Sequence, residues 1–356
     1  MFYISPRTIG RAILDLYFIN KPNLDRLVKS LLKTYKIFAP VKSDNNRFYK
    51  KVGEDGLGES VIGEIRAVEP IKSFYFPART KIAEYFSSKE DSDVKEKPIA
   101  IIGAKSCDRV SFKVMDYVYG QEPFRDPLYV SKREEGLIIS SDCTSYGETC
   151  FCVAIGITPY PEEGFDINLS ELEGGYVVEA GSGKGEKIIR DYFKLFQSAE
   201  PYVEKRNANR KKLKEDLLEH VKKSKIPPKD SIQKAFKSKF DSALWEEVSK
   251  TCVECGACNM ICPACHCFII TDQKNEDKFE RLRMWDSCLL MSFARVAGGA
   301  NPRKLLAHRM RNRFDKKFNF FQDTIGRFGC TGCGRCTEAC PGKIDIREVL
   351  SKLQTT

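Results

Sequence analysis

A cysteine pattern that occurs twice in the C-terminal third constrains this chain more than any other feature. Each copy has four cysteines separated by two, two and three residues, with a proline after the fourth. The eight cysteines are Cys252, Cys255, Cys258, Cys262, Cys330, Cys333, Cys336 and Cys340. Gly256 and Gly334 stand inside the two copies and allow the backbone to approach a bound group closely. The pattern therefore predicts two tight loops, each wrapped around a bound group.

This spacing is the one that binds [4Fe-4S] clusters in two-cluster ferredoxins, where the fourth cysteine of each run binds the other cluster. The first predicted cluster has the ligands Cys252, Cys255, Cys258 and Cys340. The second has the ligands Cys330, Cys333, Cys336 and Cys262. A pair of zinc ribbons is the alternative, but such sites use two C-x2-C pairs without a third cysteine at the same interval. Two complete copies favour iron–sulfur clusters, and hence an electron carrier.

The number of cysteines points the same way. The chain has 15 cysteines and only three histidines, so thiolates must dominate its metal chemistry. Disulfides are rare in cells that keep thiols reduced, whereas clustered cysteines are typical of metal sites. The longest apolar runs are too short to cross a bilayer, and Arg7, Arg11 and Asp15 interrupt the apolar N-terminus, so no signal peptide is predicted. We expect a cytoplasmic protein without a membrane span.

Four more cysteines lie in the N-terminal half, at Cys107, Cys143, Cys150 and Cys152. Cys107 and Cys143 each follow a predicted strand, and the carboxyl ends of strands are where α/β sheets gather their ligands. Spacing alone favours a third [4Fe-4S] cluster on these four over scattered core cysteines. We expect such a cluster at the opposite end of the molecule from the other two.

The remaining cysteines are Cys265, Cys267 and Cys288. Twelve ligands complete three clusters, so we expect these thiols to be buried and structural. A place beside a cluster sulfide, or a further ligand role, stays open.

Three regions are predicted. Residues 1–200 form an α+β (α/β-like) domain, with helices over 23–35 and 107–119 and strands over 36–40, 72–76, 98–104, 136–140 and 176–180. Residues 201–250 form a helical connector, in which apolar residues at 232, 236, 240, 244 and 248 face a core. Residues 251–356 form a mostly helical two-cluster ferredoxin domain, including a helix over about 278–299.

Several combined motifs resemble those of two related proteins, the beta subunit of cytoplasmic sulfhydrogenases and the 4Fe-4S dicluster subunit of anaerobic sulfite reductase. They are SCD at Cys107, CFC at Cys150, CGACNMICPACHCF, RMWDSC, VAGGANPR and CTGCGRCTEACP. The resemblance runs from about Val41 to the last motif. It implies an electron-transfer subunit of an anaerobic complex, between a flavoprotein that uses NAD(P)H and a catalytic subunit. That catalytic partner would be a NiFe hydrogenase, a sirohaem sulfite reductase or a heterodisulfide-reductase-type module. The resemblance also favours the third cluster.

Two other functions compete with this one. The first is a flavin-containing oxidoreductase that acts on its own substrate, but the sequence has no nucleophile–base arrangement and no full nucleotide fingerprint. The glycine-rich segment 181–187 is predicted to be a plain turn rather than a phosphate loop.

The second is a nucleic-acid-binding iron–sulfur protein, suggested by the net charge of +10. Each cluster with its thiolates carries about −2, which offsets part of that charge. The basic stretch 204–225 alternates with acids and lacks aromatics, so binding to nucleic acid is not favoured. Arginines between the two cysteine patterns could raise a cluster potential or bind an acidic partner. They are Arg281, Arg283, Arg295, Arg303, Arg309, Arg311 and Arg313.

Overall fold

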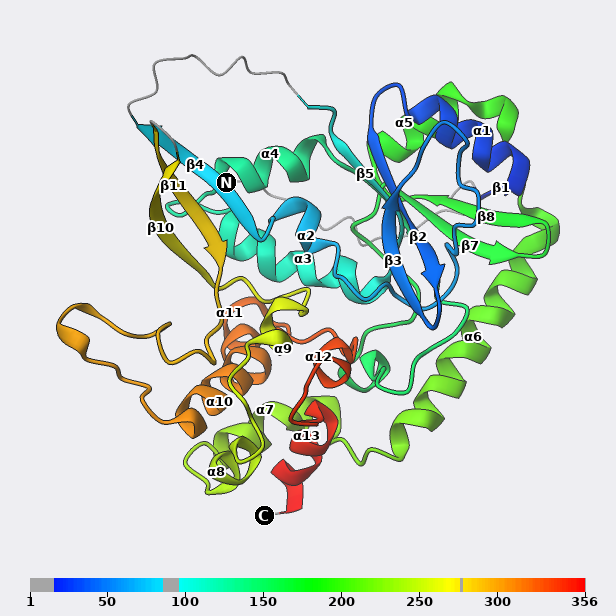
Figure 1. The fold of residues 1–356 in the computed structure, drawn as a ribbon. Helices are drawn as coiled ribbons and strands as arrows, with labels where there is room; N and C mark the ends of the chain where they lie inside the picture. The colour runs from blue at the N-terminus through cyan, green and yellow to red at the C-terminus, as the bar shows by residue number, and fades with distance from the viewer. Residues whose placement is uncertain (1–15, 86–95, 276–277, 356) are drawn as a thin grey trace.

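The structure is a computed structural model that describes residues 16–85, 96–275 and 278–355. The N-terminal charges considered above, Arg7, Arg11 and Asp15, lie outside the described residues. An α/β body forms the upper part in Figure 1, and a helical part lies below it. The two parts meet at the short helices α9 (Ala257–Met260) and α12 (Arg335–Glu338).

The α/β body is built on one mixed sheet of eight strands. Their order is β3-β2-β5-β6-β7-β8-β1-β9, and β2, β5, β6 and β7 run parallel to one another. The strands are β1 (Tyr17–Asn20), β2 (Lys36–Ser43), β3 (Asn46–Lys51), β5 (Ile99–Ala104), β6 (Leu137–Ser141), β7 (Ile167–Leu172), β8 (Gly175–Ala180) and β9 (Gln197–Ser198). The central strands read as continuous apolar runs because helices cover both faces of the sheet.

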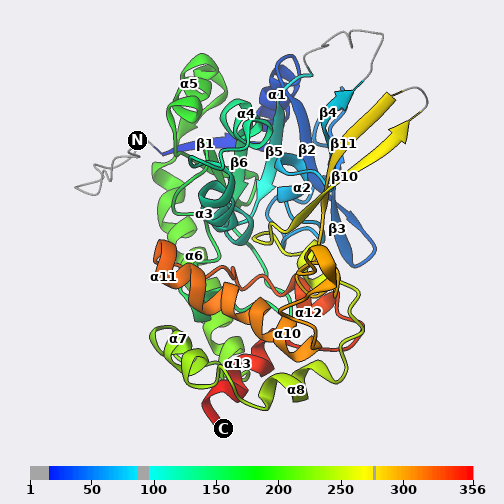
Figure 2. The same cartoon turned by 90° about the vertical axis from the view of Figure 1, so that its left-hand side faces the viewer.

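One face of the sheet packs on α1 (Lys21–Leu31) and α5 (Gly183–Asp191), around buried Leu27 and Ile189. The other face packs on α2 (Lys72–Tyr75), α3 (Ser106–Tyr119) and α4 (Pro127–Glu135). Figure 2 shows α3 and α4 in front of the sheet. These helices fix the carboxyl ends of β5 and β6, which carry two of the predicted ligands.

The lower part is helical, as predicted. Its helices are α6 (Glu200–Lys222), α7 (Lys229–Ser238), α8 (Leu244–Ser249), α10 (Leu306–Asp315), α11 (Phe321–Ile325) and α13 (Ile346–Thr355). A π-helical turn, Lys316–Phe320, joins α10 to α11. Four of the predicted core residues, at 232, 236, 244 and 248, are buried. Phe240 is 38% exposed instead, because the chain leaves the helix after Ser238 and α8 begins only at Leu244.

Two predicted elements are wrong. The segment 72–76 is the single helical turn α2 rather than a strand, since the amides of Ser73 and Phe74 bond back to the carbonyls of Pro70 and Ile71. The expected helix over 278–299 begins instead as strand β11 (Lys278–Trp285).

Strand β11 lies between β10 (Phe268–Asn275) and β4 (Arg79–Tyr85) in a separate three-stranded sheet. Its apolar residues fit a helix in sequence, but pairing on both sides with other segments decides for a strand. The mixed α/β body with a helical C-terminal part is otherwise the predicted fold class. Among the described residues, no helix has both the length and the apolar character needed to span a membrane.

Candidate iron–sulfur centres

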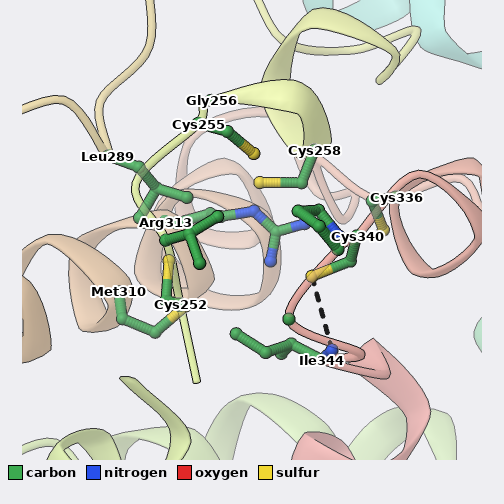
Figure 3. Close-up of a pocket in the computed structure, with 13 residues that line it drawn as sticks. Cys252, Cys255, Gly256, Cys258, Leu289, Met310, Arg313, Cys336, Cys340 and Ile344 are labelled. Carbon is green, nitrogen blue, oxygen red and sulfur yellow. Dashed lines mark hydrogen bonds between the residues drawn. The ribbon is translucent and has the colours of Figure 1, made fainter. Parts of the chain in front are cut away.

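The first predicted cluster site is a cavity lined by all four of its predicted ligands, Cys252, Cys255, Cys258 and Cys340 (Figure 3). The first three come from the loop that leads into α9 and from α9 itself, and Cys340 comes from the loop after α12. Gly256 begins α9 with a φ of +72°, a backbone conformation that favours glycine. The two cysteine patterns, far apart in the sequence, therefore meet at one site.

Arg313 of α10 extends among these cysteines (Figure 3). Burial acts to lower the pKa of its guanidinium, but the thiolates of Cys258 and Cys336 outweigh burial and hold that pKa well above its usual range. The Nε of Arg313 is buried and has no hydrogen-bond partner among the described residues. A buried cation with an unused donor fits a cluster that carries about −2 and exposes sulfide acceptors.

The second predicted site contains Cys330, Cys333, Cys336 and Cys262. Lys317, from the π-helical turn, lies with its Nζ 3.1 Å from the Cys262 sulfur. Burial acts to lower the pKa of Lys317, but Cys262 and Cys265 outweigh it and hold that pKa well above its usual range. The hydroxyl of buried Thr331 has no hydrogen-bond partner in the described part of the chain. This site too offers a cation and a free donor.

The N-terminal cysteines are brought together from separate elements. Cys107 lies in the first turn of α3, directly after β5, and Cys143 follows β6. Because β5 and β6 are parallel neighbours, their carboxyl ends meet at one edge of the sheet, as the sequence predicted. Cys150 and Cys152 reach this edge from the following loop and a short 3-10 helix, Cys152–Ile155.

The four N-terminal thiols are largely removed from solvent. Burial is the main cause that raises the pKa of each, to about 11 for Cys143, and neighbouring thiols raise it further. Thiols left protonated in such a place would be inert core groups, whereas iron binding would stabilise the thiolates. Whether these four bind a cluster stays a prediction.

The N-terminal group lies directly against the second C-terminal pattern, so its expected position at the opposite end of the molecule is wrong. The amide of Phe151 donates to the carbonyl of Gly332 at 2.8 Å. A Cβ on Gly332 would lie 2.4 Å from the Cα of Cys152, so only glycine fits there. The N-terminal cysteines are far from the C-terminal ones in sequence but close to them in space, because the loop after β6 packs against the second cysteine pattern.

Buried cations also surround the N-terminal group. The Arg335 guanidinium, 1% exposed, forms an ion pair of 2.8 Å with Asp108, which adjoins Cys107. Its Nη1 is a further buried donor for which the described residues provide no partner. Lys105 donates from its Nζ to the carbonyl of Ile62 and to the hydroxyl of Ser141, both at 2.7 Å. Arg335 thus lies between the second and third predicted sites and can offset charge at both.

Within the described residues, no three His, Cys, Asp or Glu side chains are arranged to hold a single metal ion. The thiols of the first group instead surround a cavity that Arg313 also lines. That arrangement fits a bulky anionic cluster better than a zinc ion. The ligand assignments themselves stay predictions.

Sequence reasoning missed the lysines of this region. Lys72, only 2% exposed, donates from α2 to the carbonyls of Asn259 and Cys265, at 3.3 and 3.0 Å. Lys317 was not singled out either. Neither lysine lies near a cysteine in sequence, so no local signal marked them.

The glycine-rich segment 181–187 is not the plain turn that was predicted, because helix α5 begins at Gly183 and includes most of it. Ser182 accepts a hydrogen bond from the amide of Gly185 and begins α5. A Cβ on Gly185 would lie 1.8 Å from the carbonyl oxygen of Asp166, so the segment closes on protein and leaves no room there for a phosphate.

Comparison with known proteins now gives the family. Residues 251–344 match the family model described as a 4Fe-4S dicluster domain. Over 324 residues the chain is 32% identical to sulfhydrogenase 2 subunit beta of Pyrococcus furiosus, covering 90% of this chain and 92% of that protein. The chain belongs to the sulfhydrogenase beta subunit family. It is therefore an iron–sulfur electron-transfer subunit that carries [4Fe-4S] clusters, and the resemblance stated from sequence is confirmed. No solved structure matches it.

Because Arg313 lines the cavity of the first predicted cluster, we expect it to affect the reduction potential of that cluster. Arg313→Gln should lower the reduction potential of the first cluster, because a nearby positive charge stabilises the more negative, reduced state. A unit charge about 8 Å from a cluster, at an effective dielectric constant of about 20, would shift the reduction potential of that cluster by about 100 mV. Redox titration followed by electron paramagnetic resonance measures it.

The matched control is Arg311→Gln on the same helix, since Arg311 pairs at the surface with Asp241 at 2.6 Å. Arg313→Lys keeps the charge and should retain most of the wild-type potential. An unchanged potential in Arg313→Gln, with iron content intact, would refute the role of this arginine.

Proposed function

We propose that this chain relays electrons within an anaerobic complex, between a flavoprotein subunit that uses NAD(P)H and a catalytic redox subunit. The observation that carries this proposal is the continuity of the three cysteine groups. Cys336 of the second site also lines the cavity of the first site, and the amide of Phe151, between Cys150 and Cys152, donates to the carbonyl of Gly332, next to Cys333, at 2.8 Å. Clusters that lie this close to one another would let electrons pass through the subunit from one end to the other.

The two ends of this row approach the surface. At the first site Cys255 is exposed, and the neighbouring Val253 is 63% exposed. At the third site Cys143 lines a cleft of about 420 Å³ together with Arg206, Arg210 and Tyr160. An electron donor could dock at one end and an acceptor at the other.

The relative's name, sulfhydrogenase, supports a hydrogenase as the catalytic partner. A sulfite reductase or a heterodisulfide-reductase-type module would use the same relay. Nucleic acid is not part of the proposal, because the stretch 204–225 lies mostly on α6, whose Arg206 and Arg210 are turned to Glu179 and Asp142 of the protein itself.

An anaerobic pull-down with the tagged full chain tests the proposal. We expect a flavoprotein and a catalytic redox subunit to co-purify. Val253→Lys should reduce recovery of one partner at least several-fold without loss of iron, because it adds a charge to the exposed end of the relay. Phe124→Lys is the matched control, since Phe124 is an 80% exposed apolar residue of the α/β body. Recovery of the intact iron protein alone would contradict the proposal.

The cleft beside Cys143 favours one alternative, a flavin bound by this chain that makes it an oxidoreductase in its own right. Acid release of the cofactor from purified chain, followed by absorption and fluorescence spectra, separates the two. One flavin per chain would favour the alternative, and none would favour the relay.

A further inference from the structure

Two cysteines that the cluster assignments leave unused face each other. Cys267 directly precedes β10, and Cys288 lies three residues after β11. The hairpin pairs Phe268 with Trp285, and the Asp286 amide donates to the Cys267 carbonyl at 3.0 Å, so the two strand ends are held together. The two side chains are close enough to influence each other, since Cys288 raises the pKa of Cys267 and Cys267 lowers the pKa of Cys288. Both are free thiols in this structure.

The surroundings of the two sulfurs differ. Asn259 donates from its Nδ2 to the Cys288 sulfur at 3.0 Å. The interaction with Cys267, the hydrogen bond from Asn259 and the nearby charges of Arg313 and Lys317 together outweigh burial and lower the pKa of Cys288 to about 6. A thiol that donates beside a thiolate that accepts is the arrangement from which a disulfide forms readily.

Asn259 also links this pair to the first predicted cluster. It follows Cys258 in sequence, is 1% exposed, and has its Oδ1 3.7 Å from the Cys258 sulfur. One amide side chain therefore contacts a predicted cluster ligand on one side and Cys288 on the other. Cys288 is buried and Cys267 half-buried, so soluble thiols have little access to either.

We propose that Cys267 and Cys288 form a dithiol–disulfide centre that exchanges two electrons with the clusters of this chain. In the oxidation, one S–S bond forms between the Cys267 thiol and the Cys288 thiolate, and the proton of Cys267 is released. The two electrons pass to two clusters, one to each, and reduction reverses every step. The inference rests on the proposed relay, because the clusters are its redox partners. This centre would store two electrons in a subunit whose clusters each carry one electron at a time.

The test uses the full iron-loaded chain, purified without oxygen. One sample is oxidised with thionine and one is reduced with dithionite. Both are denatured in N-ethylmaleimide without a reductant and digested for mass spectrometry. We expect a linked peptide that joins Cys267 to Cys288 in the oxidised sample only, while cluster ligands are alkylated in both.

Coulometric titration gives a second readout. Cys288→Ser should take up two electrons fewer per chain than wild type, with the same iron content. Ser292→Ala is the matched control, because it changes an exposed side chain four residues after Cys288 while leaving both thiols, and it should take up the wild-type number. Equal uptake by Cys288→Ser and wild type, without a linked peptide, would overturn the proposal.

A loss of about four irons in Cys288→Ser would also overturn it, by making the pair cluster ligands instead. These outcomes can be distinguished from a failure of the proposed relay function. In that case the partner subunits would be missing from the pull-down, while the linked peptide and the uptake of two extra electrons would remain.

Discussion

Cys258→Ala and Cys336→Ala should each lower the iron content of the anaerobically purified chain by about four atoms, from about twelve if all three clusters form. The two cysteines belong to different predicted clusters, so each change removes one ligand from one of them. Iron and acid-labile sulfide analysis gives the loss, and electron paramagnetic resonance shows which reduced signal disappears.

Cys288→Ala is the matched control, because it removes a buried cysteine that belongs to no predicted cluster. Its iron content should stay near that of wild type. Full iron in Cys336→Ala, or zinc in place of iron in the wild-type chain, would show that the ligand scheme is wrong.

Cys107→Ala alone should lower the iron content of the chain by about four atoms, while the electron paramagnetic resonance signals of the two C-terminal clusters persist. The reason is that Cys107 comes from α3 of the α/β body, and the pair of C-terminal patterns already supplies eight ligands. If the four N-terminal cysteines are only core thiols, the same variant keeps all its iron and loses a little stability through packing.

The full chain is the right material for this test. Phe151 and Cys152 belong to a core that also contains Phe314 and Leu350 of the C-terminal helices. A fragment that ended at residue 200 would expose that surface, so a colourless fragment would not distinguish a missing cluster from a missing core. Cys143→Ala in the full chain gives an independent second variant for the same cluster.

Much of the α/β body followed from local pattern. Buried runs such as 99–104 and 137–141 are strands, and the helical spacing of apolar residues at 23–35 corresponds to helix α1, because each of these patterns fits one regular structure. The helix predicted over 278–299 was wrong because pairing with a strand far away in sequence decided its secondary structure. Strand β11 pairs with β4, about two hundred residues earlier, and no periodicity within 278–285 carries that information.

The sequence by itself determined the chemistry of the C-terminal sites. Ligand spacing within a loop is a local property, so two repeats of one cysteine pattern were enough to predict iron–sulfur clusters and, with the other motifs, the family. The tertiary structure alone decided which buried groups surround those cysteines. Lys317 and Lys72 reach the predicted sites from two separate elements, and Arg335, which stands between Cys333 and Cys336, pairs with Asp108 beside Cys107. It also placed the N-terminal cysteines beside Gly332 and brought Cys267 and Cys288 to the paired ends of one hairpin. These neighbours depend on how distant segments pack, and packing is a property of the whole chain rather than of any stretch of it.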